Sequence, residues 1–482
     1  MARQDLPFVF ARDQQMVLED DALICGPGVT VFGLREARRR TGRPLRIEEI
    51  GADAFETLLN AHYRDSHGAD SDESDLSFDL EARDGTPGLR DLLEDATEAP
   101  VIELVNQLLR RTVRAGASDL HVEPYEDGLR ARVRIDGMLR TVMDRSDVPV
   151  RRVVSRLKVM SGLDTAETRL PQDGRIGLRY GGRDLDVRMS TLPGQYGERI
   201  TLRVLDRHAG LLPLDALGLT APQSAILHRL AGRPDGIVLS TGPTGSGKTT
   251  TLYSLLQLAD QAKRNIVTVE DPIEYHLPGI SQTQTNAEIG MTFAAGLRAT
   301  LRQDPDVILV GEIRDAETAT VAAQASLTGH LVFSSLHANG SVAAVTRLRD
   351  LGLEDYLIAS TLRGILAQRL LRKLCADCRQ SVPVDPAAAA LYAAYDLPVP
   401  LTLQKPQGCE TCGQTGYAGR VGVFEIVEVT EQVSTAIAEG ASEHQLRHMA
   451  VPKSGTLMAQ GLARAAAGQT SIDEVHRVLG NV

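Results

Sequence analysis

The sequence predicts an α/β fold, with a parallel sheet preceded by a smaller α+β domain. Two patterns point to this fold class. From Ile237 onward, short apolar strands alternate with helical segments, which is typical of a parallel sheet covered by helices. Before that point, residues 129–135 and 184–190 alternate apolar and polar side chains, which indicates an antiparallel sheet. The chain has 482 residues, which is too long for one hydrophobic core, so several domains are expected.

Changes in composition and periodicity divide the chain into segments. Residues 101–109 form an amphipathic helical pattern, and Asp136-Gly137 is a hairpin signal after the strand 129–135. Acidic residues crowd 65–99, where large apolar residues are few, so a flexible linker is expected there. The predicted segments are a small N-terminal domain at 1–64, the acidic linker at 65–99, the α+β domain at 100–207, a connector at 208–220, the α/β core at 221–370, a cysteine-bearing module at 371–425 and a helical C-terminal domain at 426–482.

Charge and hydropathy bear on location and partners. The net charge of -11 and the pI of about 5.6 argue against nucleic acid as the main partner. No apolar run is long enough to predict a transmembrane segment, and charged residues interrupt the first 23 positions where a signal peptide would need an apolar core. We therefore expect a cytoplasmic protein that reaches the membrane only through a partner.

Residues 242–249 match a phosphate-binding loop. The loop follows the apolar strand 236–240 and precedes a helix expected from Thr250 to Leu258, which is the context that the motif requires. Its glycines let backbone N–H groups converge on phosphate oxygens at a helix N-terminus. Lys248 is expected to reach the β- and γ-phosphates, and Thr249 to ligate Mg²⁺. The predicted ATP-binding residues are Gly242, Pro243, Thr244, Gly245, Ser246, Gly247, Lys248 and Thr249.

Two acidic sites accompany this loop. A second apolar strand at 306–310 ends in Gly311-Glu312, and a carboxylate there can orient and polarise an attacking water. Glu312 is thus the predicted catalytic base, although a strand cap with a solvated Glu is the alternative. Glu270, Asp271 and Glu274 end another β-rich run and suit contacts with Mg²⁺ or water, without the sequence deciding which of them binds the metal.

Histidines and arginines add candidates for contact with the γ-phosphate. His330 precedes and His337 follows an apolar strand, and each is a candidate, although a lone His is often only a satisfied polar group. Guanidinium groups assist phosphoryl transfer, sometimes from another subunit. The arginines considered are Arg188, Arg203, Arg298, Arg302 and Arg314, any of which could instead be a surface or ion-pair residue.

Four cysteines form two CxxC pairs, Cys375 with Cys378 and Cys409 with Cys412. Two such knuckles with glycines nearby suit a tetrahedral zinc site. No ligand position is left open for water, so a structural role is expected. A disulfide or redox pairing is the alternative, which a reducing compartment disfavours.

Together, these motifs resemble the secretion ATPase superfamily, in particular the type II secretion ATPases (general secretion pathway protein E) and their pilus-assembly relatives. The resemblance covers about residue 100 to the end. It rests on the strings 116–124, 169–175, 242–249, 270–274, 301–306 and 311–315, on the histidines at 330 and 337, and on the four cysteines.

The resemblance implies a homo-hexameric ring of RecA-like ATPase cores that binds ATP, Mg²⁺ and Zn²⁺. The 100–207 domain would close over the nucleotide and bring Arg188 and Arg203 to the γ-phosphate, and Glu312 matches the catalytic glutamate. Residues 1–64 would dock on the cytoplasmic domain of an inner-membrane secretion protein, while closure pushes on a polytopic platform protein that extrudes a pseudopilus. No direct nucleic-acid partner is implied.

Other functions remain open from sequence alone. A type IV pilus assembly ATPase is the alternative within the family, whereas pilus-retraction ATPases resemble the core but lack the cysteine module. A nucleic-acid translocating motor would need a basic channel, which the acidic balance disfavours. A zinc-bearing scaffold without enzymatic activity is disfavoured by the intact Lys248 and Glu312.

Overall fold

The protein is described from a computed structural model. The described residues are 11, 14–19, 22–41, 46–51, 55, 58, 76–78 and 99–480, without 182, 207–211 and 260–261. The chain forms two compact units, one at residues 1–77 and the other at 78–482. Most of the predicted acidic linker at 65–99 lies outside the described residues, apart from the short strand β4 (Leu76–Phe78) and the start of a helix at Ala99.

The N-terminal unit contains a small sheet and one helix. Its strands are β1 (Met16–Glu19), β2 (Ala22–Cys25) and β3 (Arg46–Glu49), in the order β1-β2-β3. Helix α2 (Val31–Thr41) follows β2, and Ala37 of this helix packs on Met16 and Leu23 in a small core. The apolar residues of 54–63 also have helical spacing in the sequence, but this range falls almost wholly outside the described residues.

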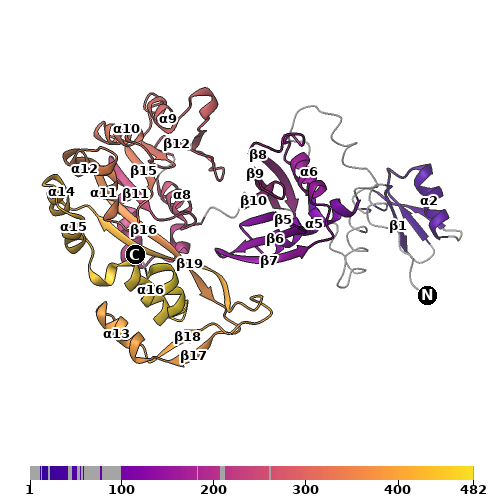
Figure 1. The fold of residues 1–482 in the computed structure, drawn as a ribbon. Coiled ribbons are helices and arrows are strands. Elements are labelled where there is room, and N and C mark those ends of the chain that lie inside the picture. The colour runs from indigo at the N-terminus through magenta and orange to yellow at the C-terminus, as the bar shows by residue number, and fades with distance from the viewer. Residues whose placement is uncertain are drawn as a thin grey trace. The chain divides into compact units, whose positions relative to one another are not determined.

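The α+β domain is an antiparallel sheet with two helices beside it (Figure 1). Apolar residues of the strands alternate inward, such as Leu120, Val122 and Val133, while arginines occupy the opposite face. Asp136-Gly137 makes the expected hairpin turn, with positive φ at both residues. The elements are α5 (Ala99–Arg114), β5 (Asp119–Tyr125), β6 (Gly128–Ile135), β7 (Met138–Arg145), α6 (Val150–Met160), β8 (Gln172–Tyr180), β9 (Arg183–Leu192) and β10 (Arg199–Asp206), with strand order β8-β9-β10-β5-β6-β7.

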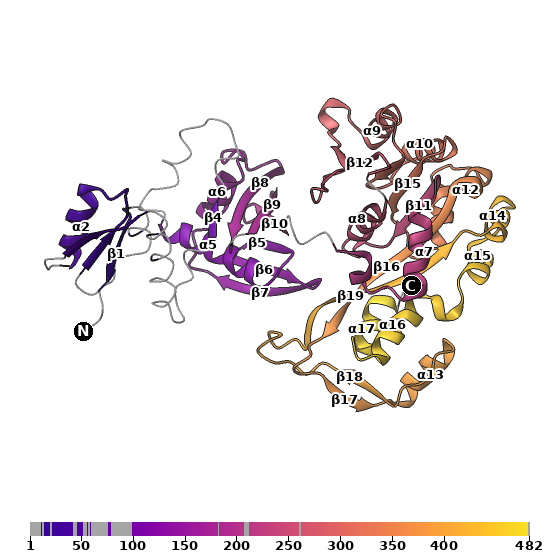
Figure 2. The same ribbon diagram turned by 180° about the vertical axis from the view of Figure 1, so that it is seen from behind.

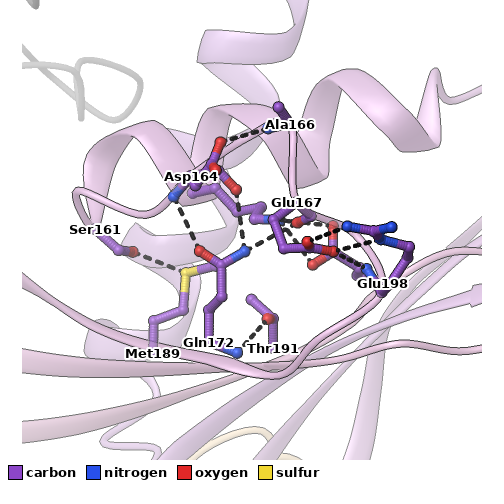
Figure 3. A network of polar contacts seen from close by, with 10 residues as sticks. Ser161, Asp164, Ala166, Glu167, Gln172, Met189, Thr191 and Glu198 are labelled. Carbon is purple, nitrogen blue, oxygen red and sulfur yellow. Dashed lines mark hydrogen bonds and ion pairs between the residues drawn. The ribbon is translucent and has the colours of Figure 1, made fainter.

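A polar network fixes the segment between α6 and β8 (Figure 3). The Gln172 side chain accepts from the Asp164 backbone N–H at 2.9 Å and donates to the Glu167 carbonyl at 2.9 Å. Beside it, the buried Lys158 ammonium contacts both carboxylate oxygens of Glu198, at 2.8 and 3.0 Å, and donates to the Glu167 carbonyl. A buried charge is costly without a partner, and Glu198 supplies one for Lys158, while the bond from Lys158 to the Glu167 carbonyl ties the segment 161–172 to α6.

The α/β core is a seven-stranded sheet in the order β13-β12-β14-β15-β11-β16-β19. All neighbouring pairs are parallel except β16 with β19, which is antiparallel. This confirms the predicted α/β fold class. The strands are β11 (Gly236–Thr241), β12 (Ile266–Glu270), β13 (Ser281–Gln284), β14 (Val307–Val310), β15 (Leu331–Leu336), β16 (Leu362–Leu374) and β19 (Tyr417–Glu428).

Helices cover both faces of this sheet, because its strands are apolar on both sides. One hydrophobic cluster joins Ile237, Ile308 and Val332 to α10, α11, α12 and α14, and the other joins Val238, Leu309 and Phe333 to α7 and α8. These helices are η1 (Leu214–Leu217), α7 (Ala221–Ala231), α8 (Lys248–Leu258), η2 (Ala287–Ile289), α9 (Phe293–Thr300), α10 (Ala316–Leu327), α11 (Ala343–Asp350), α12 (Asp355–Thr361) and α14 (Glu431–Ala438).

The cysteine-bearing part is continuous with two strands of the core sheet, β16 and β19. The predicted boundary at 370/371 lies inside β16, and the one at 425/426 lies inside β19, so the core and the cysteine module share both strands. Helices α16 and α17 pack on the outer half of this strand pair, and α13 belongs to the same hydrophobic cluster, where Tyr392 donates to the Leu462 carbonyl of α16 (Figures 1 and 2). The remaining elements are β17 (Gln380–Pro383), α13 (Pro386–Ala394), β18 (Thr402–Lys405), α15 (Glu443–Ala450), η3 (Lys453–Gly455), α16 (Leu457–Ala466) and α17 (Ile472–Leu479).

Candidate functional site: a phosphate loop at the edge of the core sheet

The phosphate loop joins β11 to α8 at the carboxyl edge of the parallel sheet, where open α/β sheets bind ligands. Gly247 stands at the N-cap of α8 with φ of 90°, a conformation that favours glycine. A Cβ at position 247 would also lie 2.7 Å from Nε2 of Gln368, so any other residue there would require the Gln368 side chain to move. The local backbone is therefore shaped by glycine and leaves the first N–H groups of α8 available to an anion.

The side chain of Lys248 folds back onto the loop that precedes it. Its ammonium donates to the carbonyls of Gly242 at 2.8 Å and Pro243 at 3.2 Å. Burial lowers the pKa of Lys248, and the negative charge of Glu312 opposes that shift. The residue predicted to bind phosphate and the residue predicted to activate water are thus close enough for the charge of one to affect the pKa of the other.

Glu312 lies two residues beyond the end of β14, on the same edge of the sheet. One of its carboxylate oxygens pairs with the Arg314 guanidinium, and the other lies 3.3 Å from Nε2 of His337. The hydrogen bond to Glu312 raises the pKa of Arg314, with smaller support from the charges of Glu312 and Asp271. Two of the predicted candidates, Glu312 and His337, are therefore in contact with each other.

The loop 337–341 after β15 is tied to the phosphate loop. The Thr241 hydroxyl, at the end of β11, donates to the Gly340 carbonyl at 3.0 Å. Arg369 of β16 donates to the Asn339 carbonyl at 2.9 Å. Because His337 begins this loop, the position of the histidine depends on the same strand edge that carries the phosphate loop.

The three predicted metal-binding acids differ in their surroundings. Glu270 is only 3% exposed, and its carboxylate accepts from Tyr253, Thr268 and Gln282, so its oxygens already have partners. Burial and the Glu270 charge raise the pKa of Tyr253 well above its usual value, so the phenol remains a donor. Asp271 is exposed, and Glu274 is half-buried. Of these acids, Asp271 is the one best able to meet a metal.

His330 lies away from the phosphate loop. It precedes β15, and its carbonyl accepts from Gly236 at the amino end of β11. Its ring nitrogen Nδ1 contacts the Ala325 carbonyl at 2.8 Å. The phosphate loop and His337 lie at the carboxyl ends of the same two strands. The structure therefore does not bring His330 to the site, because the strand separates the two histidines.

The candidate arginines have different partners. Arg188 of β9 donates to Glu274 at 3.1 Å and to the Ile273 carbonyl at 2.6 Å, which places it beside the acidic run 270–274. Arg203 pairs with Asp119 of its own sheet at 3.2 Å. Arg298 pairs with Glu317 at 2.6 Å, and Arg302 donates to the Arg298 carbonyl. Among these residues, Arg314 and Arg188 have contacts within the predicted site.

The four cysteines of the CxxC pairs converge, with their sulfur atoms all within 4.8 Å of one another. Three Sγ–Sγ distances are 3.7, 3.8 and 3.9 Å. Tetrahedral zinc thiolates with bonds of about 2.3 Å place their sulfurs about 3.8 Å apart, so the donor set fits zinc and not a disulfide. Burial opposes ionisation of Cys412, yet backbone N–H groups of Cys409 and Gly416 help lower its pKa to about 6.

Sequence reasoning missed the residues on β16 that support the phosphate loop. The Gln368 side chain accepts from the Thr251 hydroxyl of α8 at 2.7 Å, and Arg369 contacts the loop 337–341. The only signal for them is a Gln-Arg pair inside an otherwise apolar strand, Leu366 to Leu371.

Comparison with known proteins identifies the family. A family model described as "Type II/IV secretion system protein" matches residues 94–477. The chain belongs to the Type II/IV secretion system protein family. A second model, which describes a domain of "GSPII protein E", matches residues 5–63. This family membership, together with the intact phosphate loop, makes the chain an ATPase.

Relatives of this Type II/IV secretion family member cover nearly its full length. "Type II secretion system protein E" of Aeromonas hydrophila is 46% identical, over 99% of this chain and 97% of the relative. "Type II secretion system ATPase E" of Vibrio cholerae is 45% identical, over 98% of this chain and 96% of the relative. These matches confirm the resemblance to type II secretion ATPases.

Solved structures share the family fold. The ATPase DotB of Legionella pneumophila superposes with a TM-score of 0.59 at 21% identity, covering 79% of this chain and 96% of that chain. The pilus retraction motor PilT with bound ADP gives a TM-score of 0.52 at 25% identity, covering 77% of this chain and 95% of that chain. In the described part of the chain, no helix is both long and apolar enough to cross a bilayer.

Proposed function

We propose that this chain powers type II protein secretion by hydrolysing ATP, and that hydrolysis drives assembly of a pseudopilus. The observation that carries the proposal is that Lys248 and Glu312 both lie at the carboxyl edge of the core sheet, where the Glu312 charge acts on the pKa of the lysine. The 46% identity to a type II secretion system protein E over nearly the whole chain supports the secretion role. The match of the GSPII protein E domain at 5–63 favours type II secretion over type IV pilus assembly.

In the proposed reaction, the N–H groups of the loop 242–249 bind the phosphates, and Lys248 offsets their charge. Glu312 orients the attacking water and accepts its proton, while Arg314 and His337 hold the carboxylate in place. Thr249 would hold Mg²⁺ with Asp271, and the metal would supply further charge stabilisation on the phosphates. Glu270 is less suited to this role because its carboxylate is already bonded.

Nucleotide turnover is proposed to occur in a homo-hexamer in which the 100–207 domain closes over ATP. Arg188 supports this idea because it already contacts Glu274 and the Ile273 carbonyl, next to Asp271. Arg203 would exchange its Asp119 partner for phosphate during closure. An arginine that reaches the γ-phosphate only in the closed state would couple hydrolysis to movement of the domain.

The chain is proposed to work in the cytoplasm, at the inner membrane, through partners. Residues 1–64 would dock on the cytoplasmic domain of an inner-membrane secretion protein, in line with the domain match at 5–63. The acidic segment 65–99 would act as a tether that leaves the ring free to move. The ring would push on a polytopic platform protein.

Turnover per subunit is expected to rise with protein concentration, because a ring assembles by mass action. Arg188→Ala and Arg203→Ala are expected to lower the rate in the assembled state by about 10²-fold or more, since an arginine on the γ-phosphate contributes on that scale. The measurement is steady-state ATPase rate against protein concentration. Arg179→Ala, which removes an exposed ion pair of the same domain, is the matched control. A concentration-independent rate with both arginine variants fully active would overturn the motor proposal.

We also propose that Cys375, Cys378, Cys409 and Cys412 hold one structural Zn²⁺, as their sulfur spacing supports. Cys409→Ser is expected to lose the metal and to loosen the segment 375–416, because structural zinc is coupled to folding. Metal analysis and limited proteolysis of protein purified under reducing conditions would measure both effects. Cys25→Ser is the control and should keep one zinc per chain. Wild-type protein without zinc would rule out the site.

A further inference from the structure

Arg369 is a buried cation on the strand next to the phosphate loop. Arg369 is only 5% exposed. Its guanidinium donates to the carbonyls of Gln368 and Asn339 at 3.0 and 2.9 Å. Within the described ranges, no carboxylate lies within ion-pair distance of it. Taking a guanidinium out of water is costly unless an opposite charge compensates it.

Two other arginines of β16 have carboxylate partners. Arg363 pairs with Asp235 at 3.1 Å, and Arg372 pairs with Glu474 at 2.8 Å. Burial lowers the pKa of Arg369, and the charge of Glu425 opposes this shift from beyond ion-pair distance. The middle arginine of the strand therefore carries a charge that the surrounding protein offsets only in part.

The guanidinium lies against the first glycine of the phosphate loop. A Cβ built at Gly242 would lie 3.1 Å from Nη1 of Arg369 and 2.7 Å from the Gln368 carbonyl. Arg369 is also close enough to Lys248 for its charge to lower the pKa of that lysine. Two cations thus face one loop, and an anion bound there would stabilise both.

The same side chain is attached to the loop 337–341. Besides the Arg369 bond to Asn339, this loop is held by Thr241 at Gly340. At its far end, the Ser341 backbone N–H donates to buried Glu425 at 3.1 Å, and Glu425 also accepts from the N–H of Leu457 at the start of α16. Arg369 therefore lies beside Gly242 of the phosphate loop and is hydrogen-bonded to the loop that begins with His337.

We propose that Arg369 is a positioning residue for ATP: its buried charge is offset when phosphates occupy the loop 242–249, and its guanidinium holds the loop 337–341 beside them. The inference rests on the proposed function, since it needs nucleotide to bind at this loop. Arg369 acts through its electric field and through the backbone of Asn339. Part of the cost of its burial is relieved on nucleotide binding, so it contributes to affinity more than to the stability of the protein without nucleotide.

The test compares full-length wild type, Arg369→Met, Arg369→Lys and Arg363→Met. The quantities are the thermal midpoint without nucleotide and the dissociation constant for a non-hydrolysable ATP analogue with Mg²⁺. Arg369→Met should weaken binding by about tenfold, the scale of one charge-assisted interaction, while the midpoint without nucleotide stays unchanged or rises. Arg369→Lys keeps the charge and should bind within about threefold of wild type. Arg363→Met should bind as wild type.

Wild-type affinity in Arg369→Met, together with a midpoint several degrees lower, would make the residue purely structural and overturn the inference. If Arg369→Met fails to fold, Arg369→Lys decides, and a folded lysine variant that binds about tenfold more weakly would contradict the role of the charge. A wild-type chain that binds no nucleotide would overturn the proposed function, and this inference with it. The two failures are thus separated by the wild-type measurement.

Discussion

Replacing Lys248 with alanine is expected to reduce ATP turnover by about 10³-fold or more, the upper range for removing one preorganised charge from the transition state. The structure gives two reasons. The ammonium spans the phosphate loop through the carbonyls of Gly242 and Pro243, and it is half-buried, so its charge acts at low dielectric. Nucleotide affinity should fall as well, because the lysine contacts phosphate before and during the reaction.

The Lys248 prediction is measured by steady-state ATPase assay and by nucleotide titration. Lys405→Ala is the matched control, since Lys405 is an exposed lysine of β18. Circular dichroism melts would show that both variants are folded. Turnover near the wild-type rate in folded Lys248→Ala would contradict the assignment of residues 242–249 as the phosphate-binding loop.

Glu312→Gln is expected to leave ATP binding within about threefold of wild type but to slow hydrolysis by about 10²-fold or more, which is the contribution of a positioned base. Glutamine keeps the shape of the side chain and loses the charge that pairs with Arg314 and approaches His337. It cannot accept the proton of the attacking water. The affinity for ATP should therefore be nearly unchanged in this variant, while the rate of hydrolysis falls.

Single-turnover kinetics and analogue binding together test the Glu312 prediction. Glu317→Gln provides the control, because Glu317 is an exposed acid that pairs with Arg298 at 2.6 Å. If the dissociation constant for ATP rises in proportion to the loss of rate, Glu312 serves mainly as a metal or structural residue. Equal rates in wild type and Glu312→Gln would require another base.

Local patterns predicted much of the fold and part of the site. The phosphate loop, the Asp136-Gly137 turn and the helix from Ala99 depend on residues close in sequence, and each forms as expected. The cysteine pairs converge as predicted, because each CxxC presents two sulfurs locally. The catalytic role of Glu312 and the γ-phosphate role of Arg188 and Arg203 remain predictions that their contacts within the chain do not test.

Features that depend on distant pairing were not predictable from sequence. The pairing of β16 with β19 joins segments separated by the whole cysteine region, so a boundary at 370/371 looked reasonable. The burial of Glu270 against Tyr253 arises only when α8 packs on β12, and the distance of His330 from the site follows from the strand between the two histidines. The role of Gln368 and Arg369 depends in the same way on the parallel pairing of β11 with β16.

The long strand β16 connects the core sheet directly to the cluster of four cysteines. It has 13 residues, touches the phosphate loop through Gln368, and ends one residue before Cys375. At about 3.3 Å per residue, Cys375 follows Gln368 by about 20 Å along β16, which pairs with β19 over this length apart from one irregularity between Arg372 and Leu374. Because β16 belongs both to the core sheet and to the cysteine-bearing part, a movement of the sheet is expected to move the cysteine cluster with it. A fluorophore or cross-linker placed on the segment between β17 and β18, which contains α13, would thus report tilting of the ATPase sheet.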